Sequence, residues 1–323
     1  MPHILIAGKL HPAGLALLEA AQGVTFTHVE EVSEASYQPY LAQADAVVIR
    51  TQPMSAASIA KAPRLQIVSR HGVGYDAVDL AALNARKIPL CIVGDVNSVS
   101  VAEHSMMMIL ACAKQVIRSD AAVRTGPWGW RNKLEQGEVS GKRLLIIGYG
   151  RIGRHLAQMA SGFGMQIAGY DPYLAKNGWP AGNVAPVADL AAGLAQADFV
   201  SVHIPKADGP ILGAAEIAGM KPGAIIINTA RGGIVDEAAL ADALRSGQIA
   251  AAGLDVFDAE PPSAEHPLLA FDQVILTPHT AGLTREAAER MAIASVQNVL
   301  DHFAGHLDPA LIVNANFLKN GTR

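Results

Sequence analysis

The chain has 323 residues, of which 50% are hydrophobic and 17% are charged. This composition is typical of a globular protein long enough for two domains and excludes a largely disordered chain. Lys and Arg total 25 against 29 Asp and Glu, which gives a formal net charge of -4, and no long basic run occurs. We therefore expect neither nucleic acid nor an anionic membrane as a partner.

The two cysteines, Cys91 and Cys112, lie in apolar surroundings and have no CxxC or CxxH spacing. We expect buried, reduced thiols, no disulfide framework and no metal site. The N-terminus has no cationic segment, and no later stretch is long and apolar enough for an uninterrupted membrane span. These features predict a soluble, cytoplasmic protein.

Short runs rich in β-branched residues alternate with Ala- and Leu-rich helical stretches, which is typical of βαβ units and parallel sheets. The pattern predicts an α/β fold with two doubly wound parallel sheets. The strands expected for the first sheet are residues 3–8, 24–29, 46–50, 65–70 and 89–93, and those for the second are 143–148, 165–171, 199–204, 224–230, 250–257 and 274–279.

Two helical segments flank the second series of strands. Residues 101–123 have helical periodicity but are too apolar to be solvated on all sides, so this connector could also pack against another subunit. Residues 284–305 are predicted to form a long amphipathic helix. A helix so late in the sequence could return the chain to the first domain.

Gly148, Gly150 and Gly153 form a G-x-G-x-x-G motif directly after an expected strand and directly before an expected helix. This context favours a dinucleotide site, because the tight turn lets the backbone approach a pyrophosphate at a helix N-terminus. The next strand ends at Asp171, where a carboxylate can bind the ribose hydroxyls of NAD and repel the 2′-phosphate of NADP. We therefore predict NAD as the cofactor. Arg151 and Arg154 lie close in sequence and leave NADP as an alternative, unless they serve the pyrophosphate or face solvent. The alternative is a packing turn followed by a surface aspartate.

Three titratable residues follow strands of the second series, namely Arg231, Glu260 and His279. Ligands of open parallel sheets bind at the carboxyl ends of the strands. There a guanidinium can hold a carboxylate and a carbonyl oxygen, an imidazole can give or take a hydroxyl proton, and a carboxylate can orient the imidazole. Taken singly, each has a simpler explanation as a surface ion pair, a loop charge or a helix cap. Together they suit hydride transfer.

The chain resembles the D-isomer-specific 2-hydroxyacid dehydrogenases over nearly its whole length. The resemblance is carried by RHGVGYDAVD (70–79), NSVSVAEH (97–104), KRLLIIGYGRIG (142–153), NTARGGIVDEAAL (228–240), GLDVFDAEPP (253–262) and LTPHTAG (276–282). It implies an NAD-dependent enzyme that moves a hydride to or from C2 of a small 2-hydroxy or 2-keto acid, such as hydroxypyruvate, glyoxylate or 3-phosphoglycerate.

The same resemblance implies roles for individual residues. Arg231 matches the substrate-binding arginine, Glu260 the glutamate, and His279 the acid–base histidine, which also contacts substrate. Val73 and Gly74 match a loop whose backbone N–H groups hold the substrate carboxylate. The expected cofactor contacts are Gly148, Tyr149, Gly150, Arg151, Ile152, Gly153, Asp171, Pro205, Thr229, Ala230, Asp255 and Gly282, with Asp255 matching the aspartate that contacts the nicotinamide carboxamide.

Cationic residues near the Val73–Gly74 turn raise the question of substrate charge. Arg50 ends the third expected strand, and Arg70 and His71 directly precede the turn. Cations there could surround the far end of the substrate, although adjacent strand residues point to opposite faces. The alternative is that these are surface charges at loop ends.

Family members pair a discontinuous, flavodoxin-like substrate domain with an inserted Rossmann domain and usually form homodimers. The resemblance therefore implies a substrate domain of residues 1–97 and 286–323, an NAD-binding domain of residues 98–285, and a homodimer. We expect no C-terminal regulatory domain of the kind seen in longer phosphoglycerate dehydrogenases. Ala77 departs from the Asn or His common in the family.

The main alternative from another class is an NAD(H)-sensing binding protein, since corepressors of the family keep the same fold and triad. Such a scaffold would be expected to have a long disordered tail, which this sequence does not show. A formate dehydrogenase-like enzyme would have Gln in place of Glu260. A hydrolase that retains NAD would need a nucleophile motif, and none is found.

Overall fold

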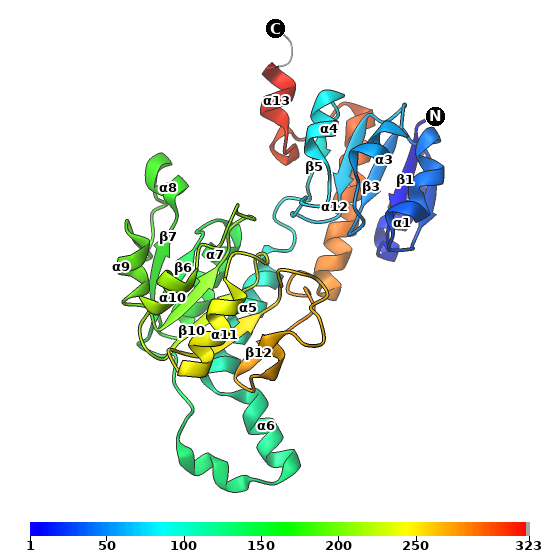
Figure 1. The fold of residues 1–323 in the computed structure, drawn as a ribbon. Helices are drawn as coiled ribbons and strands as arrows, with labels where there is room; N and C mark the ends of the chain where they lie inside the picture. The colour runs from blue at the N-terminus through cyan, green and yellow to red at the C-terminus, as the bar shows by residue number, and fades with distance from the viewer. Residues whose placement is uncertain (321–323) are drawn as a thin grey trace. The chain divides into compact units, whose positions relative to one another are not determined.

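The computed structural model describes residues 1–320 of the chain, with side chains described for residues 1–318. The chain forms two compact units, drawn in Figure 1. The first unit consists of Met1–Asn97 with Leu283–Arg323, and the second of Ser98–Gly282. Residues 321–323, the end of the segment assigned from sequence to the substrate domain, lie outside the described residues.

The first unit is built on a five-stranded parallel sheet with the order β2-β1-β3-β4-β5. Its strands are β1 (His3–Ala7), β2 (Thr25–Val29), β3 (Ala46–Ile49), β4 (Ile67–Arg70) and β5 (Leu90–Cys91). This is the flavodoxin-like strand order, in which the direction of winding reverses between β1 and β3. Arg50 directly follows β3 at this crossover.

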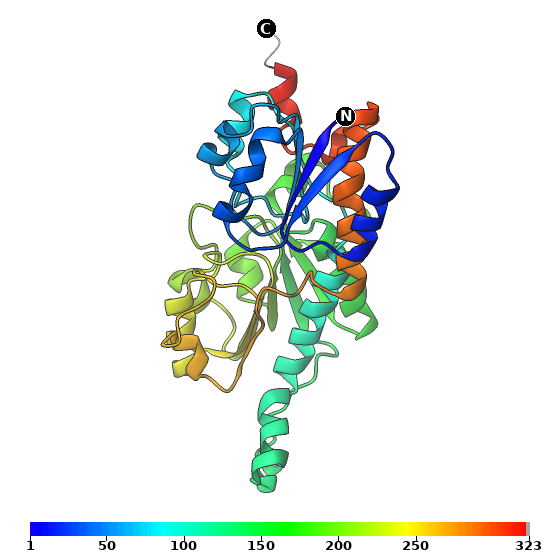
Figure 2. The ribbon, with the colours of Figure 1, turned by 90° about the vertical axis from the view of Figure 1, so that its right-hand side faces the viewer.

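Helices cover both faces of the first sheet. They are α1 (Pro12–Ala20), α2 (Glu34–Tyr37), η1 (Gln38–Gln43), α3 (Ala56–Ala60), α4 (Leu80–Ala85), α12 (Arg285–Ala304), η4 (Pro309–Leu311) and α13 (Ala315–Asn320). On one face α12 packs beside α1, as Figure 2 shows, and its Val296 and Val299 share a buried cluster with Ile4 of β1. The late helix thus completes the first unit.

The second unit is built on a seven-stranded parallel sheet with the order β12-β11-β10-β9-β6-β7-β8. Its strands are β6 (Arg143–Ile147), β7 (Gln166–Tyr170), β8 (Ala185–Pro186), β9 (Phe199–Val202), β10 (Ala224–Asn228), β11 (Ile249–Leu254) and β12 (Val274–Leu276). Six strands have the Rossmann order and β12 extends the edge. The winding reverses between β6 and β9, so the glycine motif after β6 lies at the crossover.

Helices also cover both faces of the second sheet. They are α5 (Ser98–Ala113), α6 (Val116–Thr125), η2 (Trp128–Lys133), α7 (Arg151–Gly162), α8 (Pro172–Asn177), α9 (Leu190–Leu194), α10 (Ala214–Ala218), α11 (Glu237–Ser246) and η3 (Pro267–Ala270). One face is covered by α5 and α7 and the other by α9, α10 and α11. The predicted α/β fold class, a Rossmann domain inserted into a discontinuous flavodoxin-like domain, is confirmed.

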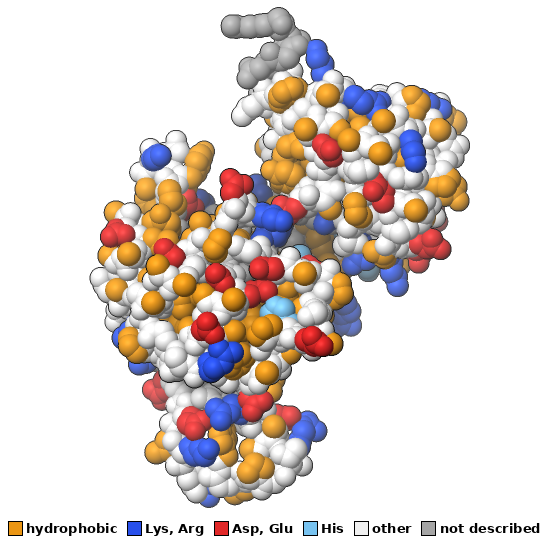
Figure 3. All heavy atoms as spheres, viewed as in Figure 1, with side chains coloured by type: hydrophobic (Ala, Val, Ile, Leu, Met, Phe, Trp, Pro, Cys, Tyr) orange, Lys and Arg blue, Asp and Glu red, His pale blue; other side chains and the backbone are white. Residues whose placement is uncertain are grey.

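Each segment expected to be a strand overlaps one, whereas the short β8 was not predicted. The connector 101–123 differs from a continuous helix, because Gln115 has a φ of 47° and separates α5 from α6. Beyond this break α6 and η2 extend away from the second sheet (Figure 1) and expose Val123, Trp128 and Leu134. Apolar and charged side chains alternate over this extension in Figure 3.

Cys91 and Cys112 are free and buried, and burial raises the pKa of each thiol to about 12. The prediction of buried thiols is therefore confirmed. Within residues 1–320, no helix is long and apolar enough to span a membrane. The same part of the chain holds no group of three or more His, Cys, Asp or Glu side chains arranged to bind a metal ion.

Candidate active site

The glycine loop after β6 has the backbone geometry that a pyrophosphate requires. Gly148 has a φ of 91°, and a Cβ on it would lie 2.4 Å from the carbonyl oxygen of His203. A Cβ on Gly153 would lie 2.4 Å from the carbonyl oxygen of Gly148, whereas one on Gly150 would meet nothing within 4 Å. Gly150 thus leaves the N-terminus of α7 open, where first-turn N–H groups have no partner within the helix. The loop fits a dinucleotide.

Asp171 follows β7 and is already held by three backbone donors. Its Oδ1 accepts hydrogen bonds from the N–H groups of Tyr173 and Leu174, both at 3.0 Å, and so caps α8. Its Oδ2 accepts the N–H of Tyr149 at 3.0 Å. A carboxylate offers about four acceptor positions, so one remains on Oδ2 for a ribose hydroxyl. The nearby Arg154 donates to the carbonyl oxygen of Tyr149 at 3.3 Å.

His279 and Glu260 are joined by a hydrogen bond of 2.7 Å between Nδ1 and Oε2. Oε1 of the same carboxylate accepts the N–H of Phe257 at 3.1 Å, which fixes the glutamate in its loop after β11. A carboxylate at Nδ1 favours a proton on that nitrogen and leaves Nε2 for a reacting oxygen. The side chains are 51% and 37% exposed, so a small substrate can reach them.

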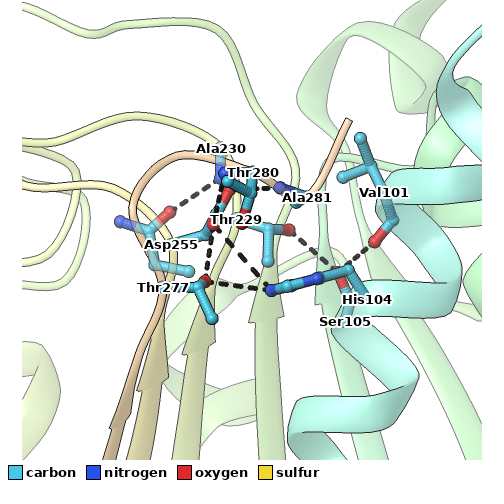
Figure 4. A network of polar contacts seen from close by, with 10 residues as sticks. Val101, His104, Ser105, Thr229, Ala230, Asp255, Thr277, Thr280 and Ala281 are labelled. Carbon is cyan, nitrogen blue, oxygen red and sulfur yellow. Dashed lines mark hydrogen bonds and ion pairs between the residues drawn. The ribbon is translucent and has the colours of Figure 1, made fainter. Parts of the chain in front are cut away.

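The backbone of His279 is held by Asp255. The histidine has a φ of 52°, which is uncommon for a residue with a side chain, and its N–H donates to the carbonyl oxygen of Asp255 at 2.8 Å. Oδ1 of Asp255 accepts the N–H of Thr280 and the hydroxyl of Thr277, and Oδ2 accepts the N–H of Ala281 at 2.9 Å (Figure 4). Asp255 therefore shapes the histidine loop, a role that sequence reasoning missed.

Arg231 follows β10 in a loop shaped by Asn228. The buried Asn228 amide accepts the N–H of Ala230 at 3.0 Å and donates to the carbonyl oxygen of Arg231 at 2.9 Å. Nη1 of Arg231 donates to the carbonyl oxygen of Ala230 at 2.6 Å. Arg231, Glu260 and His279 thus follow the adjacent strands β10, β11 and β12. Asn228 was missed as a functional residue, although it begins one of the quoted motifs.

The loops that carry Arg231 and Glu260 are tied together by Glu237, the first residue of α11. Its Oε1 accepts the N–H of Asp258 at 2.9 Å and its Oε2 pairs with Nε2 of His266 at 2.8 Å. Oδ1 of Asp258 in turn accepts the N–H of Gly233. These contacts join both loops to α11. These connections were not predicted from the sequence, because Gly233 and Glu237 lie in one quoted motif, Asp258 in another and His266 in none.

The candidate substrate residues of the first unit lie at the carboxyl end of its sheet. Arg70 Nη1 donates to the carbonyl oxygen of His71 at 2.6 Å, and the N–H of His71 donates to the carbonyl oxygen of Ile49 at 2.8 Å. His71 is only 5% exposed, whereas Arg70, the last residue of β4, is partly exposed. Burial, helped by the positive charges of Arg50 and Arg70, lowers the pKa of His71 to about 4.

Comparison with known proteins agrees with this geometry. The model for the D-isomer specific 2-hydroxyacid dehydrogenase, NAD binding domain, matches residues 106–281. The D-3-phosphoglycerate dehydrogenase of Mycobacterium tuberculosis is 38% identical over 314 residues, which cover 96% of this chain and 58% of that protein. This chain therefore spans less than two thirds of the length of that relative.

Two further relatives match over most of both chains. The hydroxypyruvate reductase of Thermotoga maritima is 37% identical over 281 residues, which cover 85% of this chain and 89% of that protein. The structure of the NADPH-dependent glyoxylate/hydroxypyruvate reductase from Sinorhizobium meliloti matches with a TM-score of 0.82 at 27% identity, covering 94% of this chain and 95% of that one. The predicted family and its dinucleotide-binding domain are confirmed: this chain belongs to the D-isomer specific 2-hydroxyacid dehydrogenases.

Proposed function

We propose that this protein is an NAD-dependent dehydrogenase acting on C2 of a small 2-hydroxy or 2-keto acid. The observation that carries the proposal is the 2.7 Å hydrogen bond between His279 and Glu260 in the second unit, whose sheet also carries the glycine loop. In the reducing direction, a reduced nicotinamide bound at the glycine loop would supply the hydride to C2 of the substrate carbonyl, and Nε2 of His279 would donate the proton to its oxygen. Oxidation reverses both transfers.

The three candidate catalytic residues divide the work by their chemistry. Glu260 is hydrogen-bonded to Nδ1 of His279 and so keeps the imidazole in one orientation. Arg231 presents a planar guanidinium that can hold the carboxylate and the carbonyl oxygen of a 2-keto acid at once. The positive charge also stabilises the negative charge that develops on the carbonyl oxygen during hydride addition.

Asp171 supports NAD over NADP as the preferred cofactor. The reductase from Sinorhizobium meliloti is NADPH-dependent by name, so this fold accommodates either dinucleotide. In this chain a carboxylate stands at the end of β7 with one acceptor position left. That position suits a ribose hydroxyl, whereas a 2′-phosphate would be repelled by the negative charge.

The substrate class follows from the relatives and from the charges of the first unit. The relatives include phosphoglycerate dehydrogenases and a hydroxypyruvate reductase, whose named substrates are small 2-hydroxy or 2-keto acids. We assign the backbone of Val73 and Gly74 to the substrate carboxylate. Arg50, beside Arg70, is our candidate for a second anionic group on the substrate.

A second copy of this chain is the partner that the extension of the second unit favours. Ile117, Val123, Trp128 and Leu134 are 52%, 66%, 62% and 86% exposed, respectively. Apolar side chains exposed together on a projecting segment are typical of an interaction surface. We propose a homodimer, and sedimentation velocity of the unaltered protein and of Trp128→Ser with Leu134→Ser tests it. A monomeric unaltered protein would contradict it.

A substrate screen tests the proposed reaction. Hydroxypyruvate, glyoxylate, pyruvate, phosphohydroxypyruvate, sulfopyruvate and oxaloacetate would each be mixed with NADH or NADPH, and absorbance at the nicotinamide band followed. We expect turnover of at least one keto acid with NADH, and its loss in His279→Ala. An NAD(H)-sensing scaffold would instead bind NADH tightly and turn over none of these acids, which would overturn the proposal.

A further inference from the structure

His104, on α5, contacts the loop that carries the candidate catalytic histidine. Its Nε2 lies 3.0 Å from Oγ1 of Thr277 and 3.8 Å from Oδ1 of Asp255 (Figure 4). The His104 side chain is 18% exposed and that of Asp255 only 1%. A titratable side chain therefore reaches from a helix on one face of the sheet to its carboxyl edge.

The directions of the hydrogen bonds in this group can be assigned. Oδ1 of Asp255 accepts the N–H of Thr280 at 2.8 Å, so this oxygen is an acceptor. The hydroxyl of Thr277 must then donate to it, across 2.5 Å. A hydroxyl has one hydrogen, so the oxygen of Thr277 accepts from Nε2–H of His104. The result is a directed series of hydrogen bonds from His104 through Thr277 to Asp255.

These hydrogen bonds leave Asp255 with one unused acceptor position. The carboxylate has about four acceptor positions, and the protein fills three of them through Thr277, Thr280 and Ala281. The remaining position is on Oδ2. A carboxylate with almost no exposure to water gains from each additional donor. The nicotinamide carboxamide carries such a donor in its NH₂ group.

We propose that His104 is a positioning residue that, through Thr277, orients Asp255 to accept a hydrogen bond from the carboxamide of the cofactor. The proposal rests on the dinucleotide binding of the proposed function. The neighbouring Ser105 makes a parallel contact, since its hydroxyl donates to the carbonyl oxygen of Val101 and its oxygen accepts the hydroxyl of Thr229 at 2.8 Å. α5 thus supports the ends of both β10 and β12.

The test is calorimetric binding of two reduced cofactors to the purified protein. One is NADH, and the other is reduced 3-acetylpyridine adenine dinucleotide, in which a methyl ketone replaces the carboxamide and removes its NH₂ donors. We expect His104→Ala to weaken NADH binding by about 2- to 10-fold, the worth of one hydrogen bond. The same change should leave binding of the analogue within about twofold of the unaltered protein.

Three companion variants separate positioning from general support of the fold. His104→Gln keeps a side-chain N–H donor and should recover most of the NADH affinity. Thr277→Val removes the hydroxyl that links His104 to Asp255, so adding His104→Ala to it should cause no further loss of NADH affinity. Glu103→Ala changes the adjacent, exposed residue of α5 and should bind both cofactors normally.

The outcomes are distinguishable. If His104→Ala weakens both cofactors equally, or if its effect adds to that of Thr277→Val, then His104 supports α5 and does not position Asp255. If His104→Ala does not fold, as judged by its melting temperature, the comparison of His104→Gln and Thr277→Val on the two cofactors decides in its place. If the unaltered protein binds neither cofactor, the proposed function itself is wrong.

Discussion

At the carboxyl edge of the seven-stranded sheet, hydrogen bonds within the protein hold the candidate site residues. Asp255 fixes the backbone of His279, Glu260 fixes its ring, and Asn228 shapes the loop of Arg231. The edge of the five-stranded sheet differs. There Arg50 and Arg70 bring positive charge to the ends of β3 and β4, beside a glycine-containing turn. Both charges help to lower the pKa of the buried His71.

From this difference we infer separate roles, with hydride and proton transfer in the second unit and recognition of the substrate's charge in the first. Hydride and proton transfer need reacting groups held within fractions of an ångström, which a connected set of hydrogen bonds provides. Recognition of an anionic substrate needs charge and open N–H groups and tolerates looser placement. We therefore expect changes in the second unit to reduce the rate for every substrate, and changes in the first unit to alter which substrates are used.

The largest effect is expected from His279→Ala. Removal of a positioned general acid should lower kcat by about 10²–10⁴-fold, while NADH still binds. Steady-state kinetics together with calorimetric NADH titration check this. His306→Ala, at an exposed histidine of the first unit, is the control and should retain full activity. Equal loss of NADH binding and of rate would mean that His279 supports the cofactor site and not proton transfer.

Arg231→Lys should have the next largest effect. Lysine keeps the charge but lacks the planar fork, so we expect kcat/KM to fall by about 10- to 100-fold, the worth of one charge-assisted hydrogen bond. The loss should be similar for all keto acids that are substrates. A loss confined to acids with a second anionic group would move Arg231 to the recognition role that we assign to the first unit.

Asp171→Ser should reduce the preference for NADH over NADPH by about tenfold, because the repulsion of the 2′-phosphate is removed. Serine also caps helix N-termini, so α8 should remain folded. The ratio of kcat/KM values for the two cofactors measures the effect. An unaltered protein that uses both cofactors equally well would contradict the role of Asp171.

The sequence predicted what depends on short-range pattern. Parallel strands buried on both faces appear in the sequence as apolar runs, and the glycine motif marks the turn between a strand and a helix. The two-residue strand β8 is too short to have such a pattern. The break between α5 and α6 was missed because Gln115 adopts a left-handed conformation, which glutamine rarely does.

The site was predicted as a set of strand-end residues in which Glu260 pairs with His279, whereas the other hydrogen bonds that connect the site were not predicted. Glu237 and His266 join across 29 positions, and His104 and Thr277 across 173. Such contacts depend on how helices pack on the sheet, which no local pattern specifies. Asp255 illustrates the limit, because the resemblance assigned it to the cofactor and gave no indication that it also holds the histidine loop.

Arg50→Gln tests the recognition role of the first unit. Loss of a partly exposed charge should reduce kcat/KM for phosphorylated or dicarboxylic substrates by about 2- to 10-fold. Glyoxylate, which has no second anionic group, should be turned over normally. Kinetics with paired substrates measure this selectivity. If the unaltered enzyme prefers pyruvate and glyoxylate to their charged analogues, the first unit has no second anion site.

The smallest effect on turnover at neutral pH is expected from two histidines, the buried His71 of the first unit and the half-buried His203 of the second. Burial lowers the pKa of His71 to about 4 and that of His203 to about 3. Both folded values lie below the unfolded value of about 6.5, so the unfolded chain binds more protons as the pH falls. Each histidine therefore costs stability progressively below about pH 6.5. For His71 the loss should level off near pH 4 at roughly 3 kcal/mol.

The two histidines should respond differently to replacement by phenylalanine. Within the described residues neither ring nitrogen of His71 has a hydrogen-bond partner, whereas Nε2 of His203 pairs with Oγ of Ser201 at 2.8 Å. His71→Phe should therefore leave the melting temperature nearly unchanged at pH 7 and raise it relative to the unaltered protein at pH 5. His203→Phe leaves the buried hydroxyl of Ser201 without this hydrogen-bond partner and should lower the free energy of unfolding by about 1–3 kcal/mol at pH 7. Melting curves at both pH values check this, and a His71→Phe variant that keeps the full acid sensitivity would show that His71 is protonated in the folded protein.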